Sequence, residues 1–278
     1  MTGAIADAHI HLFQEGYPGR YGKGPYGLGH EVEIYERFRS QHSIESSLII
    51  GFEGRGIEPD NNANIRRLAA TRPWMITAAY IEPSARPDAD AIEALMAQGH
   101  KGVSIYLRDA KDTAAVISWP KASWQKLNER EAIISLNATP EATDGLGNLI
   151  ENYRRCVFLF SHLGLPGRYS AAANQRQASA RLAPLLRLTP FPNALVKISG
   201  FYAVSDPPHA YPHEAAFQFL DIVLNRFGTE RCCWGSDFSP SLDFVSFVQT
   251  ISIPALDRLP AIDRERVMGG NLLNLIGR

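Results

Sequence analysis

Residues 4–13 read AIADAHIHLF, a short apolar segment that carries two histidines one residue apart, His9 and His11. Side chains at positions i and i+2 share one face of a β-strand, whereas on a helix they would point apart. If this segment is a strand whose Ala8 and Ile10 face outward, both imidazoles face the interior of the fold. The pair then predicts either a chemical site at the end of a strand or two hydrogen-bonded core histidines.

Seven further segments of the same kind follow along the chain. Each is short, rich in Val, Ile, Leu or aromatic residues, and bounded by Gly, Pro or polar residues, which is the pattern of buried strands. They are SIESSLIIGFE (43–53), MITAAYIEP (75–83), HKGVSIYL (100–107), AIISLNA (132–138), CVFLFSHLG (156–164), ALVKISGFY (194–202) and CCWGSDF (232–238). The sequence therefore predicts eight strands.

Segments with helical spacing lie between these strands, and residues 31–42, with apolar Val32, Ile34, Tyr35 and Phe38, are an example. The predicted helices are 31–42, 88–99, 120–130, 140–155, 174–188, 212–228, 241–250 and 263–277. Alternation of strands and helices implies right-handed βαβ units and a parallel sheet. Since 278 residues suit a closed barrel, which takes about 250 residues, we predict one α/β domain over residues 1–278, a (β/α)8 TIM barrel. A doubly wound open sheet is the alternative.

Composition restricts the classes of function. The formal net charge is −1, so we expect neither a nucleic-acid partner nor a membrane partner. No basic segment followed by an apolar run begins the chain, and no apolar run approaches the roughly 18 residues of a membrane span. The three cysteines, Cys156, Cys232 and Cys233, contain no Cys-x-x-Cys spacing. We therefore expect reduced thiols in a cytoplasmic protein.

Polar residues at the ends of buried strands mark the candidate site, because barrel enzymes carry their active sites at the carboxyl ends of the strands. His162 follows the sixth strand, and we expect it to point inward because it shares strand parity with Phe158 and Phe160. A histidine that caps a helix or belongs to a turn is the alternative.

Asp237 ends the eighth strand, in WGSDFSP. It could cap the following helix, although Ser239 and Ser241 are better placed for that role. The first and eighth strands are neighbours in a closed barrel, so Asp237 is expected beside His9 and His11.

The ordered motifs DAHIHLF (7–13), FSHLG (160–164), VKISG (196–200) and WGSDFSP (234–240) resemble the amidohydrolase-related family of the amidohydrolase superfamily. They most resemble its branch of pyrone dicarboxylate lactonases and sugar-lactone hydrolases. The resemblance runs on to GGNLLNLIG (269–277) and so covers the whole chain. It implies a distorted (β/α)8 barrel, in agreement with the alternation of strands and helices.

The resemblance also implies roles for the strand-end residues. In the wider superfamily the His-x-His pair and the strand-eight aspartate bind a divalent metal, and strands four to six usually add Lys or Glu and two histidines. Here strand six offers His162, but strand five offers Asn137, and strand four offers Tyr106 and Arg108. We therefore expect no two-metal site.

Two chemical interpretations remain open. In the first, His9, His11 and Asp237 hold one Zn²⁺ or Mn²⁺, and a water in the open position loses its proton more easily. In the second, no metal is required: Asp237 is the general base for water, while His9, His11 and His162 bind and polarise a lactone carbonyl. The histidine missing from strand five favours the second.

The predicted function is therefore hydrolysis of a small lactone of an organic acid or sugar acid. One alternative is a mononuclear metal-dependent amidohydrolase or decarboxylase on the same barrel. Another is a barrel that binds a small ligand without catalysis, because barrels host many functions.

The expected substrate is a small molecule that carries an anion or several hydroxyls, and a homo-oligomer is compatible with the sequence. Arginine suits carboxylate recognition, and a lysine inside an apolar strand needs a polar partner. The candidate substrate-binding residues are Tyr106, Arg108, Asn137, Arg168, Tyr169, Lys197 and Tyr202, with Tyr17, Arg20, Tyr21 and Tyr26 from the loop 15–30 after the first strand.

Overall fold

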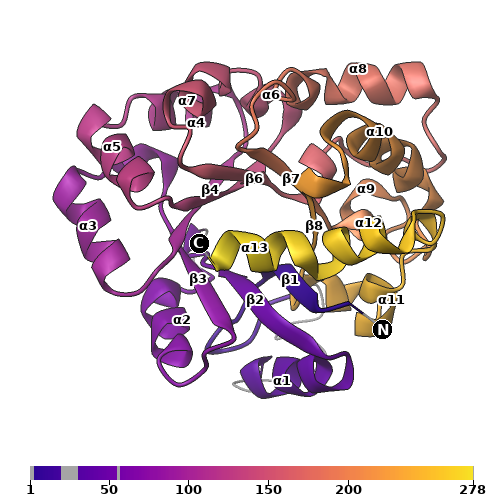
Figure 1. The fold of residues 1–278 in the computed structure, drawn as a ribbon, viewed down its shortest axis with the longest axis horizontal. Helices are drawn as coiled ribbons and strands as arrows, with labels where there is room; N and C mark the ends of the chain where they lie inside the picture. Colours follow the sequence, from indigo (N-terminus) through magenta and orange to yellow (C-terminus); the bar gives the residue numbers. More distant parts are fainter. Residues whose placement is uncertain (1–2, 20–30, 55–56, 278) are drawn as a thin grey trace.

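Eight parallel strands form the centre of the protein (Figure 1). The computed structural model describes residues 3–19, 31–54 and 57–277. The strands pair in chain order and are β1 Ile5–Ile10, β2 Ile44–Ile50, β3 Met75–Tyr80, β4 Gly102–Leu107, β5 Ile133–Ala138, β6 Val157–Phe160, β7 Ala194–Ile198 and β8 Cys232–Trp234. The predicted (β/α)8 barrel is confirmed.

Helices surround the strands on the outside (Figure 1). They are α1 Glu31–Gln41, α2 Asn61–Ala69, α3 Ala89–Ala97, α4 Ala110–Ile117, α5 Lys121–Glu129, α6 Pro140–Thr143, α7 Gly147–Asn152, α8 Gln175–Leu186, α9 Phe201–Val204, α10 Phe217–Phe227, α11 Phe247–Ile251, α12 Ala261–Glu265 and α13 Asn271–Ile276. The sequence patterns did not predict α2, α4 or α9, and the first residues of α9 fall in the predicted strand 194–202. They predicted one helix over 140–155, whereas the glycine-containing segment 144–146 separates α6 from α7. No helix in the described part of the chain is long and apolar enough to cross a membrane.

The barrel closes between β1 and the residues that follow β8. The backbone N–H of Asp237 donates to the carbonyl of His9 at 2.8 Å, and that of His11 donates to the carbonyl of Phe238. The buried carboxylate of Asp7 accepts the N–H of Ser236 at 2.9 Å and the hydroxyl of Tyr35 at 3.0 Å. Burial raises the pKa of Asp7 to about 6. These hydrogen bonds join the first strand to the segment after the last strand and so close the barrel.

A bulge in β1 changes which of its side chains face inward. Asp7 pairs with Ser47 and Ile10 pairs with Ile49, so three steps along β1 match two along β2. Such an extra residue redirects the side chains that follow it. The expectation that Ala8 faces the outer helices was wrong, since Ala8 belongs to the inner apolar cluster. Asp7 reaches outward to Tyr35 of α1, whereas His9 points into the barrel.

The inner apolar cluster fills the amino-terminal end of the barrel. Ile133, Leu159 and Leu195 of the strands pack there with Leu272 and Leu275 of α13. Helix α13 lies across this end of the barrel (Figure 1). The opposite end, where the strands finish, is left for polar side chains.

Candidate functional site

Four polar side chains meet at the carboxyl end of the barrel. His9 and His11 come from the end of β1, His162 from the turn after β6, and Asp237 from the segment after β8. All four are 5% exposed or less. Nε2 of His9 lies 3.1 Å from Nε2 of His11 and 3.5 Å from Oδ1 of Asp237, and Nε2 of His162 lies 3.8 Å from Oδ2 of Asp237. The predicted neighbours therefore converge on one point.

The tautomer of His11 follows from its backbone contact. Nδ1 lies 2.8 Å from the carbonyl oxygen of Ile50. A carbonyl only accepts, so Nδ1 carries the proton and Nε2 turns its lone pair towards the mouth of the barrel. Burial lowers the pKa of His11 to about 4, and the charge of Lys197 adds to that effect. His11 is therefore a neutral imidazole.

Ser199 is the polar partner of His162. The backbone N–H of His162 donates to Oγ of Ser199 at 3.3 Å, and the same Oγ lies 3.0 Å from Nδ1 of the ring. When the hydroxyl of Ser199 donates to Nδ1, the ring proton lies on Nε2 of His162, which faces Asp237. Burial, with Lys197 as the next cause, lowers the pKa of His162 to about 3.

A left-handed turn, and not strand parity, aims His162 into the site. His162 faces the site, as predicted, but the reason given for it was wrong: Phe158 stacks on Trp124 of α5, outside the barrel, so the parity shared with Phe158 points outward. The chain leaves β6 with φ near 55° at both His162 and Leu163, which reverses the direction of the ring. Gly200 makes room for it, because a Cβ there would lie 2.3 Å from Nδ1 of His162.

Asp237 is a buried carboxylate in a strained position, with φ of 57°. Burial raises its pKa to about 7, while a hydrogen bond from Tyr202 and the charge of Lys197 act in the opposite direction. The hydroxyl of Tyr202 donates to Oδ2 at 2.6 Å. Ser239 precedes the short helix at Pro240–Asp243, and its hydroxyl donates to Glu31 at 2.6 Å. Asp237 thus faces the site and is poised to exchange a proton near neutral pH.

His9 lies at the centre of the cluster, and its side chain contacts residues that lie deeper in the barrel. Nδ1 faces Nζ of Lys197 at 2.9 Å and Oγ of Ser161 at 3.3 Å. Burial, followed by the charge of Lys197, lowers the pKa of His9 well below its ordinary value. Gly235 lies against the base of this side chain, since a Cβ there would come 2.8 Å from Cβ of His9.

A pocket of about 350 Å³ opens above the cluster. Its lining combines the polar groups of the site with a wall of aromatic rings: His11, Phe13, Tyr17, Phe52, Ile57, Tyr106, Arg108, Asn137, His162, Tyr202, Asp237 and Pro240. The hydroxyl of Tyr106 lies 3.5 Å from Nε2 of His11. This pocket suits a small organic molecule with its reacting atom beside Asp237.

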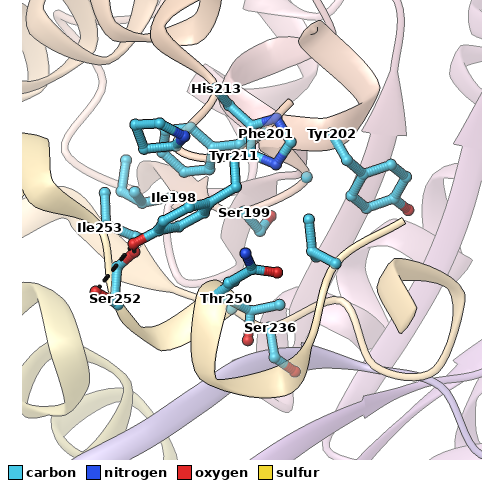
Figure 2. A pocket seen from close by; sticks show the side chains of 15 residues that line it. Ile198, Ser199, Phe201, Tyr202, Tyr211, His213, Ser236, Thr250, Ser252 and Ile253 are labelled. Carbon is cyan, nitrogen blue, oxygen red and sulfur yellow. Dashed lines mark hydrogen bonds between the residues drawn. The ribbon is translucent and has the colours of Figure 1, made fainter. Parts of the chain in front are cut away.

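A second, narrower cavity lies behind Tyr202 (Figure 2). Ser199, Ser236, His213 and Ile253 are among the residues on its wall. Nδ1 of the buried His213 has no hydrogen-bond partner in the described part of the chain. The cavity offers about 30 Å³ to the centre of a water molecule, which is room for buried water but not for a substrate.

The predicted substrate-binding residues fall into three groups. Tyr17, Tyr106, Arg108, Asn137 and Tyr202 line the pocket. The remaining described candidates, Lys197, Arg168 and Tyr169, do not line it: Lys197 lies beneath His9, Arg168 is exposed outside the lining, and Tyr169 packs on Phe219. Arg20, Tyr21 and Tyr26 lie outside the described residues, and their role stays a prediction.

Several residues of the pocket were not predicted from the sequence. Phe13 lies two positions after His11, and Phe52 lies two positions after the inward-facing Ile50. Strand parity could have found both. Ser161 and Ser199 gave no signal in the sequence beyond their place within the motifs FSHLG and VKISG.

The ligand atoms of His9, His11 and Asp237 fit a single divalent metal ion. Four-coordinate zinc, with ligands at about 2.0–2.2 Å, separates its ligand atoms by roughly 3.3–3.5 Å. The three separations here are 3.1, 3.5 and 3.8 Å. The bond from Nδ1 of His11 to a backbone carbonyl is also the support that metal-binding histidines commonly receive. His9, His162 and Asp237 form a second such group, with ligand atoms within 4.8 Å.

Known proteins share this fold. The sequence model described as Amidohydrolase matches residues 6–275. An amidohydrolase from Burkholderia multivorans, solved with HEPES and with zinc, is 17% identical, covers 99% of each chain and gives TM-scores of 0.80 and 0.79. A "probable 2-pyrone-4,6-dicarboxylic acid hydrolase" from Acinetobacter baumannii, with citric acid bound, is 16% identical over 100% of both chains, with a TM-score of 0.75.

A decarboxylase has a similar structure. A 2,6-dihydroxybenzoate decarboxylase in complex with 2,6-dihydroxybenzoate is 14% identical, covers 100% of this chain and 99% of its own, and gives a TM-score of 0.65. A search of curated proteins gives no match. At these identities the solved structures support the barrel fold and leave the reaction to be argued from the site.

Proposed function

This chain belongs to the amidohydrolase family, and from that premise we propose that it is a hydrolase that opens a small lactone by attack of water. The observation that carries the proposal is Asp237, a buried carboxylate whose pKa is raised to about 7 and which faces three neutral imidazoles at the base of the pocket. A general base works best when its pKa lies near the operating pH.

The first step of the proposed reaction is attack of water on the lactone carbonyl. A water molecule beside Asp237 gives a proton to the carboxylate as its oxygen bonds to the carbonyl carbon. The carbonyl oxygen gains negative charge and accepts a hydrogen bond from Nε2–H of His162 and, when His9 is in the corresponding tautomer, from Nε2–H of His9. Such donors, already oriented in a buried site, stabilise the charge of the transition state.

Collapse of the tetrahedral intermediate then breaks the ester C–O bond of the ring. The protonated Asp237 returns its proton to the departing oxygen, which stays tethered to the product as a hydroxyl. Water and lactone thus give one hydroxy acid, and the carboxylate is restored. A lactone carbonyl is more electrophilic than an amide carbonyl, so the step needs less activation.

The lining of the pocket supports a small acidic or hydroxylated substrate. Arg108 and Asn137 lie at the ends of β4 and β5, where a guanidinium and an amide can bind a carboxylate or hydroxyls. Tyr17, Phe52 and Tyr106 supply flat apolar surface for the ring of the substrate. The Acinetobacter baumannii protein, which has a similar fold, binds citric acid, and this supports an acidic ligand.

Metal-dependent hydrolysis or decarboxylation is the second candidate. It is favoured by the fit of His9, His11 and Asp237 to one divalent ion, and by the zinc bound in the Burkholderia multivorans protein. When bound, such an ion would polarise a carbonyl and lower the pKa of water. Asp237 would then be a ligand, and His162 would remain a hydrogen-bond donor to the substrate.

A panel of lactones, assayed by the acid that ring opening releases, tests the proposal. Protein purified with and without a chelator should open at least one lactone at equal rates, and Asp237→Asn should abolish that turnover. Asp257→Asn, an exposed carboxylate far from the pocket, is the matched control and should keep full activity. Loss of activity with the chelator and recovery with Zn²⁺ or Mn²⁺ would support the second candidate instead. Ligand binding without turnover of any lactone would support a binding protein.

A further inference from the structure

Lys197 is a buried cation beneath the site, and the proposed reaction does not use it. It projects from the middle of β7 into the barrel and is 0% exposed. Nζ has two polar partners: Oγ of Ser135 at 2.7 Å and Nδ1 of His9 at 2.9 Å. A buried ammonium without good partners is costly, so these contacts fix where the side chain lies.

The contacts of Lys197 and His11 decide which nitrogen of His9 carries its proton. Burial lowers the pKa of Lys197 to about 7, and its charged form, an ammonium, donates and cannot accept. While Lys197 is charged, Nδ1 of His9 is therefore the acceptor and the proton of the neutral ring lies on Nε2. Nε2 of His11 presents a lone pair, because Nδ1 of His11 donates to Ile50. The 3.1 Å contact between the two Nε2 atoms is then a hydrogen bond from His9 to His11. Nε2–H of His9 therefore donates to His11 in the free protein, and the carbonyl oxygen of a bound lactone would have to replace that acceptor.

The hydrogen bonds from Lys197 to His9 and from His9 to His11 disfavour the binding of a metal ion by His9. A metal bound by His9 needs the lone pair of Nε2, and the ring proton must then move to Nδ1, where it faces Nζ of Lys197. The positive charge of Lys197 would also lie one imidazole away from the ion. His9 therefore cannot accept the bond from Lys197 and bind a metal at the same time while it remains neutral.

We propose that Lys197 is a positioning residue that holds His9 as an Nε2–H donor and thereby weakens divalent metal binding at His9, His11 and Asp237. The inference rests on the proposed function only in taking these three residues as the reacting site. Lys197 would thus decide whether His9 acts as a hydrogen-bond donor or as a metal ligand, although Lys197 itself touches neither substrate nor metal.

Zinc affinity tests the inference without any measurement of turnover. Lys197→Met removes the donor and keeps the apolar stem, and we expect the purified metal-free variant to bind Zn²⁺ tighter than wild type by about tenfold or more, in competition with a chromophoric chelator. Ser135→Ala removes the other partner of Lys197 but keeps the ammonium, and its Zn²⁺ affinity should stay close to that of wild type. Equal or weaker Zn²⁺ binding by a folded Lys197→Met variant would overturn the proposal.

The ring nitrogens of His9 provide a second measurement, which does not require the Lys197→Met variant and needs a folded His9→Gln variant only for assignment. In wild-type protein labelled with ¹⁵N in its histidine rings, we expect Nε2 of His9 to carry the proton and Nδ1 to show a lone pair; loss of these signals in His9→Gln assigns them. A lone pair on Nε2 of His9 in metal-free wild type would contradict the inference. Failure to open any lactone would refute the proposed function and leave both of these results unaffected.

Discussion

The two ends of the barrel are built from the same eight strands but carry opposite chemistry. At the amino-terminal end, Leu195 and Ile133 pack under Leu272 and Leu275 of α13, and the interior is apolar. At the carboxyl end, Asp237 and His162 are buried with their backbone in the left-handed region. Burying charge and straining the backbone both cost stability, so the apolar end has to compensate for the reactive end. We therefore expect substitutions at the carboxyl end to change mainly activity, and substitutions at the amino-terminal end to change mainly stability.

Replacing the base at the carboxyl end should have the largest effect on activity. We expect Asp237→Asn to lower kcat on a lactone substrate by about a thousandfold, because proton transfer by a positioned base contributes on that order. Michaelis–Menten kinetics at pH 8 check this. A variant that keeps more than a tenth of the wild-type kcat would show that another group activates water.

The same variant should gain stability, which sharpens the contrast between the ends. The pKa of Asp237 in the folded protein, about 7, lies above its ordinary value of 3.8. The folded state therefore keeps this proton to a higher pH than the unfolded state does. As a result, the free energy of unfolding of the protein falls as the pH rises from about 4 to about 7. Asparagine removes that loss, so Asp237→Asn should be more stable at pH 8, by on the order of 1–3 kcal/mol. Denaturant titrations at pH 5 and pH 8 would measure it, with a smaller difference at pH 5.

Truncation at the amino-terminal end should do the reverse. Leu272→Ala should lower the free energy of unfolding by about 2–5 kcal/mol, because it leaves a cavity between α13 and the strands. The kcat of the folded fraction should stay near that of wild type. Ile262→Ala, at a side chain that is 56% exposed, is the control and should change stability little. A large loss of kcat in Leu272→Ala would show that the two ends are coupled.

A change to the hydrogen bond on Asp237 should move the pH profile. Activity requires the deprotonated carboxylate, so kcat/KM of wild type should rise with pH through about 7. The hydroxyl of Tyr202 stabilises the charged form, and its removal in Tyr202→Phe should shift the rising limb upward by about one pH unit. An unchanged limb would mean that another group controls the ionisation.

The smallest effect is expected at the rim of the pocket. Arg108 is exposed, so its attraction for an anionic substrate is weakened by solvent. Arg108→Gln should raise KM for an acidic lactone by roughly fivefold and leave kcat near wild type. An uncharged lactone of similar size is the control, and its KM should not change. Equal effects on both lactones would remove Arg108 as the carboxylate-binding residue.

The fold and the main cluster could be predicted because they depend on local patterns and on barrel topology. Short apolar runs alternating with helical segments predicted the barrel, and the polar residues at the strand ends predicted His9, His11, His162 and Asp237 as the site. The direction of a side chain, and its depth below the mouth of the barrel, were harder to predict. His162 enters through a left-handed turn, which strand parity does not describe. Lys197 was predicted to bind substrate because a lysine inside an apolar strand needs a polar partner, but its partners are Ser135 and His9, below the mouth of the barrel.

The bulge in β1 and the helix boundaries show a further limit. One extra residue between Asp7 and Ile10 reverses which neighbours face inward, and its cause lies in the pairing with β2, which is not encoded in β1 alone. The helices α2 and α4 were missed because their buried positions are largely polar, Asn61, Asn64 and Thr113, so their apolar pattern is weak. Tertiary pairing and exposure, more than local propensity, set these features.

The hydrogen bond from Ser236 to Asp7 joins residues 229 positions apart, and it lies directly beside the reacting groups. During synthesis His9 and His11 leave the ribosome well before Asp237. We therefore expect the proposed site to be complete only once the eighth strand has docked on the first. Closure of the barrel and acquisition of activity should then be one event, and a protein truncated before residue 237 should be inactive however well its remaining strands pair.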